Sequence, residues 1–348
     1  LVVDERIVGP EFGADSSRQA AGGKPIAWDG GKGSVGAEGP ETGTDRLADA
    51  LAAIPGATAL QENASLARFT SLRTGGPADW FLVAETVTAL RRAVVLAWQS
   101  GCECRVLGGG SNVLVSDEGI RGLVVINRAR GVSFTEEGVK AESGASLSTL
   151  VRKCVAQGLG GLEWAVGIPG SVGGAVVGNA GAWGGDVASV LIRGQVLGQD
   201  GVVHTWLPER FAFGYRTSLL KQPSSRDSRQ EVILDAEFAL ERRDRKDLED
   251  RVEEIVSQRK ASQPAGATCG SVFKNPPGDY AGRLIEAAGL KGHRRGSAQI
   301  SGQHANFIVN QGGAKAADVK ALIDLARSSV SARFGTELEL EIELVGEW

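Results

Sequence analysis

The sequence predicts a mixed fold of helices and strands, α+β or α/β, with two or three domains. At 348 residues the chain has room for about two to three domains of ordinary size. Its 42% hydrophobic and 23% charged residues suit a globular protein with a buried core. Segments with helical spacing of apolar residues alternate along the chain with strand-like runs, which is typical of such folds.

Composition and charge argue against several classes of protein. The formal charge is −4 and no basic block stands out, which disfavours a nucleic-acid binder. No apolar run approaches the roughly 18 residues of a membrane span, and Leu1–Pro10 is too charged for a signal peptide. We therefore expect a cytoplasmic protein. The four cysteines and three histidines have irregular spacing, so we expect neither a disulfide framework nor a metal site.

The first third of the chain begins with a region that cannot form a core. Residues 9–45 hold ten glycines and three prolines with few large apolar groups, so we expect residues 1–44 to be a flexible tail. Asp45 is then a plausible N-cap for a short helix. A second helix is predicted over Thr86–Gln99. Strands are predicted at Arg105–Leu107, Val113–Val115 and Leu123–Ile126.

The rest of the chain continues the alternation. Apolar spacing predicts helices at Ser146–Gln157, Tyr280–Ala288 and Ala316–Arg333. Strands are predicted at Val190–Leu197, Val232–Leu240 and His304–Asn310. The highly charged run Glu241–Lys260 is interpreted as a solvated helix that joins two domains. The chain closes on Glu337–Leu344, whose strict alternation of polar and apolar residues predicts a strand.

Two glycine-rich loops follow strand-like sequence. The first is Leu107–Asn112, and the second runs from Gly167 through Ala175 and on to Gly184. Glycine lets backbone N–H groups converge on an anion without an intervening Cβ, and a pyrophosphate is the natural guest. Neither loop fits the dinucleotide GxGxxG pattern or the P-loop pattern. A single loop of this kind is more often just a tight turn, but two long ones in one chain make phosphate binding an equal alternative.

Three further segments carry groups that could do chemistry. Cys269–Pro276 places a hydroxyl, a cation and an amide close together, although it could be an ordinary loop. Phe213–Arg216 offers an arginine able to fork a carboxylate or phosphate, although such an arginine is often structural. The glutamates of Glu337–Leu344 would share one face of the closing strand, which by default is a solvated face.

In this order, the motifs resemble the UDP-N-acetylenolpyruvoylglucosamine reductase family, whose members are also called UDP-N-acetylmuramate dehydrogenases. The resemblance covers residues 45–348 and is carried by eight segments. These are Ser71–Asp79, Leu107–Asn112, Gly167–Gly184, Phe213–Arg216, Gly270–Pro276, Ala281–Glu286, His304–Asn310 and the closing Glu-rich run.

The resemblance implies an α+β fold with an FAD-binding domain of two α/β halves, of the vanillyl-alcohol-oxidase type, and a C-terminal α/β substrate-binding domain. The expected bounds are residues 45–126 and 127–242 for the halves and 243–348 for the C-terminal domain. FAD would lie between the halves. NADPH would reduce it and leave, and UDP-N-acetylglucosamine enolpyruvate would then be reduced to UDP-N-acetylmuramate for peptidoglycan synthesis. We also expect a monomer.

The family's functional residues carry over onto matching positions. Arg216 and Glu341 would stabilise the enolate that forms when hydride reaches the β-carbon, and Ser271 would give a proton to the α-carbon. The implied substrate-binding residues are Tyr215, Lys274, Asn275 and His304. The implied cofactor-binding residues are Arg73, Gly75, Gly108, Gly109, Gly110, Ser111, Asn112, Gly167, Ile168, Pro169, Gly170, Ser171, Gly173, Gly174, Asn179 and Gly181.

The chain departs from the family pattern at three positions. Leu340 and Glu343 stand where the family usually has proline and arginine, and Ser262 stands where it often has lysine. The short interval between Arg216 and Ser271 is similar to that of the family subtype that lacks a tyrosine loop closing over the substrate.

Two rival functions stay open. One is an FAD oxidase of a sugar or alcohol on the same scaffold, and the other is a flavin- or nucleotide-binding protein without turnover.

Overall fold

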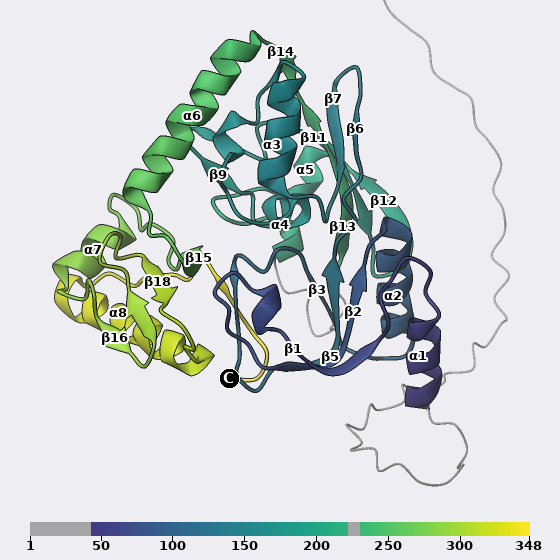
Figure 1. Cartoon of the computed structure of the whole chain (residues 1–348), viewed down its shortest axis with the longest axis horizontal. Helices are drawn as coiled ribbons and strands as arrows, with labels where there is room; N and C mark the ends of the chain where they lie inside the picture. Colours follow the sequence, from purple (N-terminus) through teal and green to yellow (C-terminus); the bar gives the residue numbers. More distant parts are fainter. Residues whose placement is uncertain (1–42, 222–229) are drawn as a thin grey trace, which may run out of the picture.

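The computed structural model describes residues 43–221 and 230–348 (Figure 1). All but the last two residues of the expected tail, 1–44, lie outside the described residues. Those two belong to helix α1 (Gly43–Ala52), which therefore begins two residues before the predicted cap Asp45. None of the described helices combines the length and the apolar character that a membrane crossing needs.

The first sheet has the order β1-β2-β5-β3. Its strands are β1 (Gln61–Ser65), β2 (Pro77–Ala84), β5 (Ile120–Asn127) and β3 (Cys104–Leu107). The last three run parallel, and β1 pairs antiparallel with β2. The helices α1 and α2 (Val87–Gln99) pack on one face and bury Leu47, Leu90 and Trp98 there. Helix α2 starts as predicted, because the Thr86 side chain accepts a hydrogen bond from the backbone N–H of Ala89 at 3.1 Å.

The second sheet is antiparallel, with the order β12-β11-β13-β7-β6. Its strands are β12 (Val203–Trp206), β11 (Leu191–Leu197), β13 (Val232–Ala239), β7 (Gly138–Glu142) and β6 (Val132–Phe134). Helices α3 (Leu147–Ala156) and α4 (Val172–Val177) pack on it, with Leu150, Val172 and Phe238 in one core. The short helix α5 (Pro208–Phe211) precedes the loop that carries Arg216.

The third sheet has the order β15-β18-β17-β16. Its strands are β15 (Ala267–Ser271), β18 (Phe307–Asn310), β17 (Ala298–Ile300) and β16 (Arg294–Arg295), and helices α7 (Ala281–Ala287) and α8 (Ala316–Phe334) cover it. These elements form the lobe drawn in yellow and light green in Figure 1. Its core also takes in Leu72 and Leu114, so the lobe packs against the first half of the chain.

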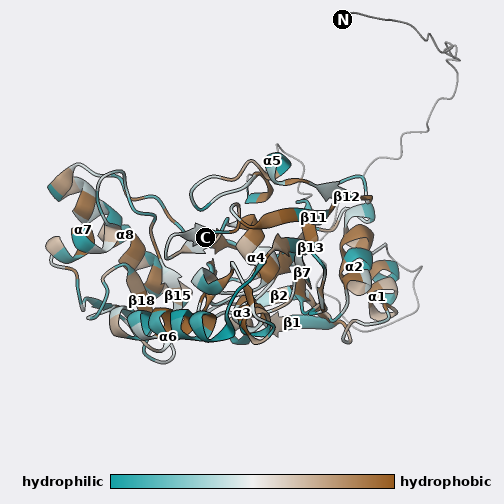
Figure 2. Cartoon of the chain, turned by 90° about the horizontal axis from the view of Figure 1, so that it is seen from above, coloured by the Kyte–Doolittle hydropathy of each residue, from teal (hydrophilic) through white to brown (hydrophobic). Residues whose placement is uncertain are grey.

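Helix α6 (Arg245–Ser262) begins four residues later than the predicted helix. Glu241–Arg242 instead forms strand β14, which pairs with β8 (Leu159–Gly160), and the carboxylate of Asp244 caps the helix. Most of α6 is hydrophilic, as predicted (Figure 2). Leu248 and Ile255 are nevertheless buried in the core of the second sheet, so one face of this helix is packed rather than solvated.

The prediction of a closing strand over Glu337–Leu344 is wrong for most of its length. Only β19 (Glu343–Val345) is a strand, and it pairs in parallel with β4 (Val113–Val115). The preceding segment makes one isolated bridge, between Leu340 and Phe273. The segment crosses from the third sheet to the first half of the chain, so no single neighbour can pair with all of it. This crossing brings Glu341 beside the first glycine-rich loop.

Candidate active site

A cavity of about 890 Å³ lies where the two glycine-rich loops meet the C-terminal lobe. This volume falls within the roughly 300–1,000 Å³ of most ligand pockets. Its wall brings together predicted residues that are far apart in the sequence. Those lining it are Gly108, Gly109, Gly110, Ser111, Asn112, Gly167, Ile168, Pro169, Gly170, Ser171, Gly173, Gly174, Gly181, Arg216, Ser271, Asn275 and Glu341.

The two glycine-rich loops pack directly against each other. A Cβ on Gly108 would come within 2.2 Å of the Ser171 hydroxyl, and one on Gly109 within 2.9 Å of Gly170 Cα. Gly110 has φ +58°, and its Cβ would lie 2.1 Å from the carbonyl oxygen of Phe69. The Ser111 hydroxyl donates a hydrogen bond to the Pro169 carbonyl at 2.9 Å and joins the loops. Close packing alone therefore requires glycine here.

The loops also leave backbone donors available at the cavity. Among the described residues, the N–H groups of Gly109, Gly110, Ser111 and Gly170 have no acceptor. Unsatisfied N–H groups that converge on one cavity form an anion-binding concavity. The steric packing and the available donors are compatible with each other, so the tight-turn explanation does not exclude an anion site at these loops.

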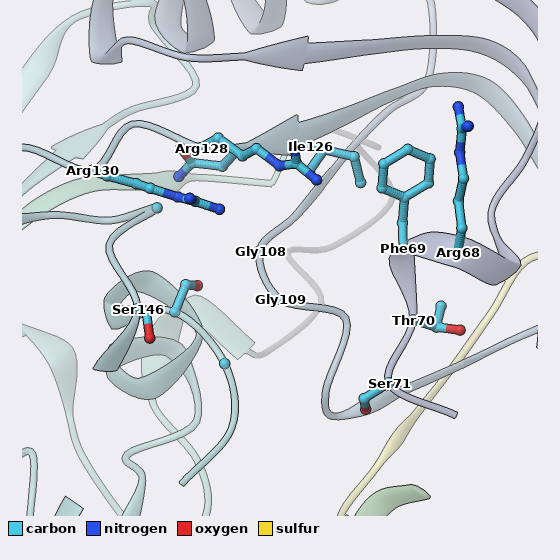
Figure 3. A pocket seen from close by; sticks show the side chains of 14 residues that line it. Arg68, Phe69, Thr70, Ser71, Gly108, Gly109, Ile126, Arg128, Arg130 and Ser146 are labelled. Atoms are coloured by element: carbon cyan, nitrogen blue, oxygen red, sulfur yellow. The ribbon is translucent and has the colours of Figure 1, made fainter. Parts of the chain in front are cut away.

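A smaller pocket of about 240 Å³ shares Gly108, Gly109, Gly170 and Ser171 with the main cavity (Figure 3). Figure 3 shows Arg128 and Arg130 on one side of it and Phe69 with Arg68 on the other. The three arginines make no ion pair with any described residue, although Arg68 lies 4.8 Å from the centre of the Phe69 ring. A second positively charged compartment thus adjoins the glycine-rich loops.

Arg216 and Glu341 form an ion pair inside the main cavity. Arg216 Nε lies 2.7 Å from Glu341 Oε1, and Nη1 donates to the Gly181 carbonyl at 2.7 Å. Arg216 has φ +59°, which is unusual for a residue other than glycine and frequent at functional sites. Asn179 supports this loop, because its side-chain amide donates to the Gly214 carbonyl at 3.0 Å.

Hydrogen bonds with two other segments of the chain hold the backbone of Glu341. Its N–H donates to the Val272 carbonyl at 2.9 Å, and its own carbonyl accepts from the Asn112 side chain at 3.1 Å. Burial raises the pKa of its carboxyl above the usual value, although the positive charges of Arg216, Lys221 and Lys274 oppose this effect. Glu341 therefore links the glycine-rich loop to the segment that carries Ser271.

Ser271 ends strand β15, where the pairing with β18 is irregular. Gly270, with φ +81°, turns the backbone just before it. The Ser271 hydroxyl lines the cavity, and no hydrogen bond joins it to another described residue. Its neighbour Asn275 also lines the cavity, but the Asn275 side chain accepts from the Ala281 N–H at 3.1 Å and so caps helix α7. The Ser271 hydroxyl is thus available to a ligand.

Six predicted site residues do not line the cavity: Arg73, Gly75, Asn179, Tyr215, Lys274 and His304. Asn179 supports the Arg216 loop instead, and Lys274 pairs with Glu339 at 3.3 Å. The His304 ring is half-buried against Phe307, and its Nδ1 accepts from the Asn306 N–H at 3.2 Å. Burial lowers the pKa of this imidazole. Tyr215 is 57% exposed.

The structure adds cavity residues that the sequence did not single out. Arg259 on α6 faces Gly167, and its guanidinium makes no hydrogen bond or ion pair with any described residue. Lys221 lies beside the Arg216–Glu341 pair. Cys104 and Cys269 also line the cavity, but burial raises the pKa of each thiol to about 12, so both stay protonated and unreactive. A single charged residue in a polar stretch forms no recognisable motif, so Arg259 and Lys221 could not be predicted from the sequence.

Comparisons with known proteins decide the family. A model of the UDP-N-acetylenolpyruvoylglucosamine reductase C-terminal domain matches residues 262–345, and a model of an FAD-binding domain matches residues 78–206. The reductase of Chloroflexus aggregans is 46% identical over 294 residues, which cover 82% of this chain and 97% of that protein. This chain is a member of the UDP-N-acetylenolpyruvoylglucosamine reductase family.

Other family members agree with this assignment. The Halalkalibacterium halodurans reductase is 44% identical over 82% of this chain and 94% of its own length. The crystal structure of the reductase from Thermus caldophilus superposes with a TM-score of 0.70 at 38% identity, covering 82% of this chain and 99% of that one. The predicted fold class is confirmed: an α+β protein with an FAD-binding domain and a C-terminal domain typical of the reductase family.

Proposed function

We propose that this protein reduces the enolpyruvyl group of UDP-N-acetylglucosamine enolpyruvate to a lactyl ether, giving UDP-N-acetylmuramate for peptidoglycan synthesis, with NADPH as the electron source. The observation that carries this proposal is the convergence of Ser271, Arg216 and Glu341 on the cavity that the two glycine-rich loops line. Family membership supplies the reaction type, and the cavity supplies groups suited to it.

A bound FAD would supply the hydride chemistry that links NADPH to the β-carbon of the enol ether. The free N–H groups of Gly109, Gly110 and Ser111 would hold its pyrophosphate, with Gly170 across from them. Asn112 bonds to Glu341, so the cofactor loop and a proposed catalytic residue are fixed to each other. We infer that the hydrogen bond between Asn112 and Glu341 keeps the reacting carbon within reach of the cofactor and of Glu341 at the same time.

Hydride addition places negative charge on a carbon next to a carboxylate. Arg216 supplies a positive charge and several donors for that negative charge. Glu341 can donate a hydrogen bond there only when it is protonated, and burial, which raises the pKa of its carboxyl, favours that state. The ion pair with Arg216 describes the resting site, and we propose that the substrate carboxylate displaces Glu341 from it.

The Ser271 hydroxyl is the proposed proton donor to the α-carbon. It lines the same cavity as Arg216 and has no partner among the described residues, so it can turn toward a substrate. A serine hydroxyl is a weak acid, and its proton leaves readily only when positive charge or a donor stabilises the alkoxide. Lys274, three residues away in sequence, pairs with Glu339 outside the cavity wall, but its positive charge acts on Glu341 inside the cavity.

An anaerobic titration of the FAD-loaded protein tests this function. NADPH should bleach the flavin absorbance, and UDP-N-acetylglucosamine enolpyruvate should then restore it without oxygen. Flavin that stays bleached until air is admitted would indicate an oxidase or another acceptor. Protein that binds no FAD would contradict the cofactor assignment.

A further inference from the structure

Lys221 is a cation that lines the cavity, and hydrogen bonds hold the turn that carries it. It ends the short 3-10 helix η3 (Leu219–Lys221), in which Leu220 is buried. The fully buried Ser218 donates to the Val177 carbonyl of α4 at 2.7 Å, and the Lys221 N–H donates back to the Ser218 carbonyl at 3.1 Å. The turn is therefore anchored to α4, and the Lys221 side chain lines the cavity.

The Lys221 ammonium joins two segments that are distant in the sequence. Its Nζ donates to the Glu341 carbonyl at 3.2 Å and to the Arg216 carbonyl at 3.4 Å. No other described group donates to the Arg216 carbonyl, whereas the Glu341 carbonyl also accepts from Asn112. One ammonium thus connects the backbones of both members of the ion pair.

The charges around this ammonium show that it does more than fill space. Burial lowers the pKa of this ammonium, Glu343 and Glu341 act against that effect, and Lys274 and Arg216 add to it. The charged groups that act on the Glu341 carboxyl are Arg216 from the loop after α5, Lys221 from η3 and Lys274 from the loop after β15. Removing Lys221 would therefore alter both the placement and the protonation of Glu341.

We propose that Lys221 is a positioning residue, which holds the Arg216–Glu341 pair in register across the contact between the η3 loop and the last segment of the chain. It acts through the two carbonyls rather than on the reacting carbon. The inference rests on the proposed function. It adds a residue outside the motifs by which the chain resembles its family.

The test compares Lys221→Met, which keeps the side-chain length and removes the donors, with Lys221→Arg, which keeps charge and donors. Lys246→Met on the exposed face of α6 is the matched control. Hydrogen exchange of the FAD-loaded proteins is measured over residues 336–343. Exchange should be faster in Lys221→Met and close to wild type in Lys221→Arg and Lys246→Met.

Stopped-flow kinetics of the two half-reactions complete the test. In Lys221→Met, reoxidation by the enolpyruvyl substrate should slow by about 10-fold to 100-fold, the effect of losing one or two charge-assisted hydrogen bonds. If protonated Glu341 is required, the pH at which this rate falls should move upward in Lys221→Met, because a cation that favours the carboxylate is gone. Lys221→Arg should restore both rate and pH profile.

Two outcomes would overturn the proposal. One is a Lys221→Met protein with wild-type exchange and kinetics. The other is equal slowing in the Met and Arg variants with an unchanged pH profile, which would reveal only a packing role. Wild-type protein that is not reoxidised by the enolpyruvyl substrate would contradict the proposed function itself, and the exchange comparison would still decide the role of Lys221.

Discussion

The glycine-rich loops and the cluster around Glu341 line one cavity, but different forces hold them in place. The loops are fixed by sterics, since Gly108 and Gly109 approach Ser171 and Gly170 too closely for a side chain. The cluster is fixed by an ion pair and by polar bonds from Lys221 and Asn112. Substitutions in the loops should therefore reduce stability and cofactor retention, whereas substitutions in the cluster should reduce turnover in a folded protein.

A large loss of turnover is expected at Arg216. Arg216→Lys keeps the charge but cannot reach both the Glu341 carboxylate and the Gly181 carbonyl, because it lacks the guanidinium fork. We expect the rate of flavin reoxidation by substrate to fall by about 10²- to 10³-fold. Thermal stability should change little. Arg210→Lys, on the exposed side of α5, is the control and should react at the wild-type rate.

A change in a glycine-rich loop should act on folding instead. Gly110→Ala would place a Cβ 2.1 Å from the Phe69 carbonyl oxygen at φ +58°, which we expect to cost about 1–3 kcal/mol of unfolding free energy and to weaken FAD retention. Gly174→Ala is the matched control, since the nearest atom to its Cβ would be 3.6 Å away. Denaturant unfolding measures the stability of the two variants. Equal stability of the two variants would refute the steric account.

Substitution of Arg259 should have an intermediate effect. Its guanidinium lines the cavity beside Gly167, without a partner among the described residues. If it binds a phosphate of FAD, Arg259→Ala should raise the dissociation constant of FAD about 10-fold, as expected for one lost charged hydrogen bond. Lys260→Ala, its exposed neighbour on α6, should leave FAD affinity unchanged. Calorimetric titration of each apoprotein with FAD measures the two dissociation constants.

The smallest effect concerns stability at Glu341. Its carboxyl has a pKa raised above 4.5 in the folded protein, so the native state binds more protons than the unfolded state as pH rises through this region. Stability is therefore lost as pH increases above 4.5. Glu341→Gln removes this loss, and its melting temperature should exceed that of wild type more at pH 8 than at pH 4. If the difference in melting temperature between Glu341→Gln and wild type became smaller as the pH rises, the proposed effect of burial on the pKa of Glu341 would be contradicted.

Sequence patterns identified the elements whose signals are local. Helices α2 and α3 follow from apolar spacing and from the caps Thr86 and Ser146. Strand β2 was missed, because it is buried on both faces over most of its length and shows no alternation. The closing segment was predicted as a strand from alternation alone, and that prediction is wrong because its neighbours change along its length.

The candidate site was predictable to a similar extent. Motif resemblance pointed to Ser271, Arg216 and Glu341, which the fold places on one cavity. Lys221 and Arg259 were missed, since a single cation acquires meaning only through the partners that folding brings to it. The ion pair between Lys274 and Glu339, at 3.3 Å, could not be predicted either, because only the folded chain brings these two residues together.

The account depends most on Ser271 acting only in the second half-reaction. Stopped-flow measurements on Ser271→Ala should show flavin reduction by NADPH at the wild-type rate. Reoxidation by the enolpyruvyl substrate should be slower by about 10²- to 10⁴-fold, the usual contribution of a positioned proton donor. Ser262→Ala, whose hydroxyl bonds only to its own helix, is the control. A Ser271→Ala protein that is reoxidised as fast as wild type would contradict the assignment of Ser271 as the proton donor.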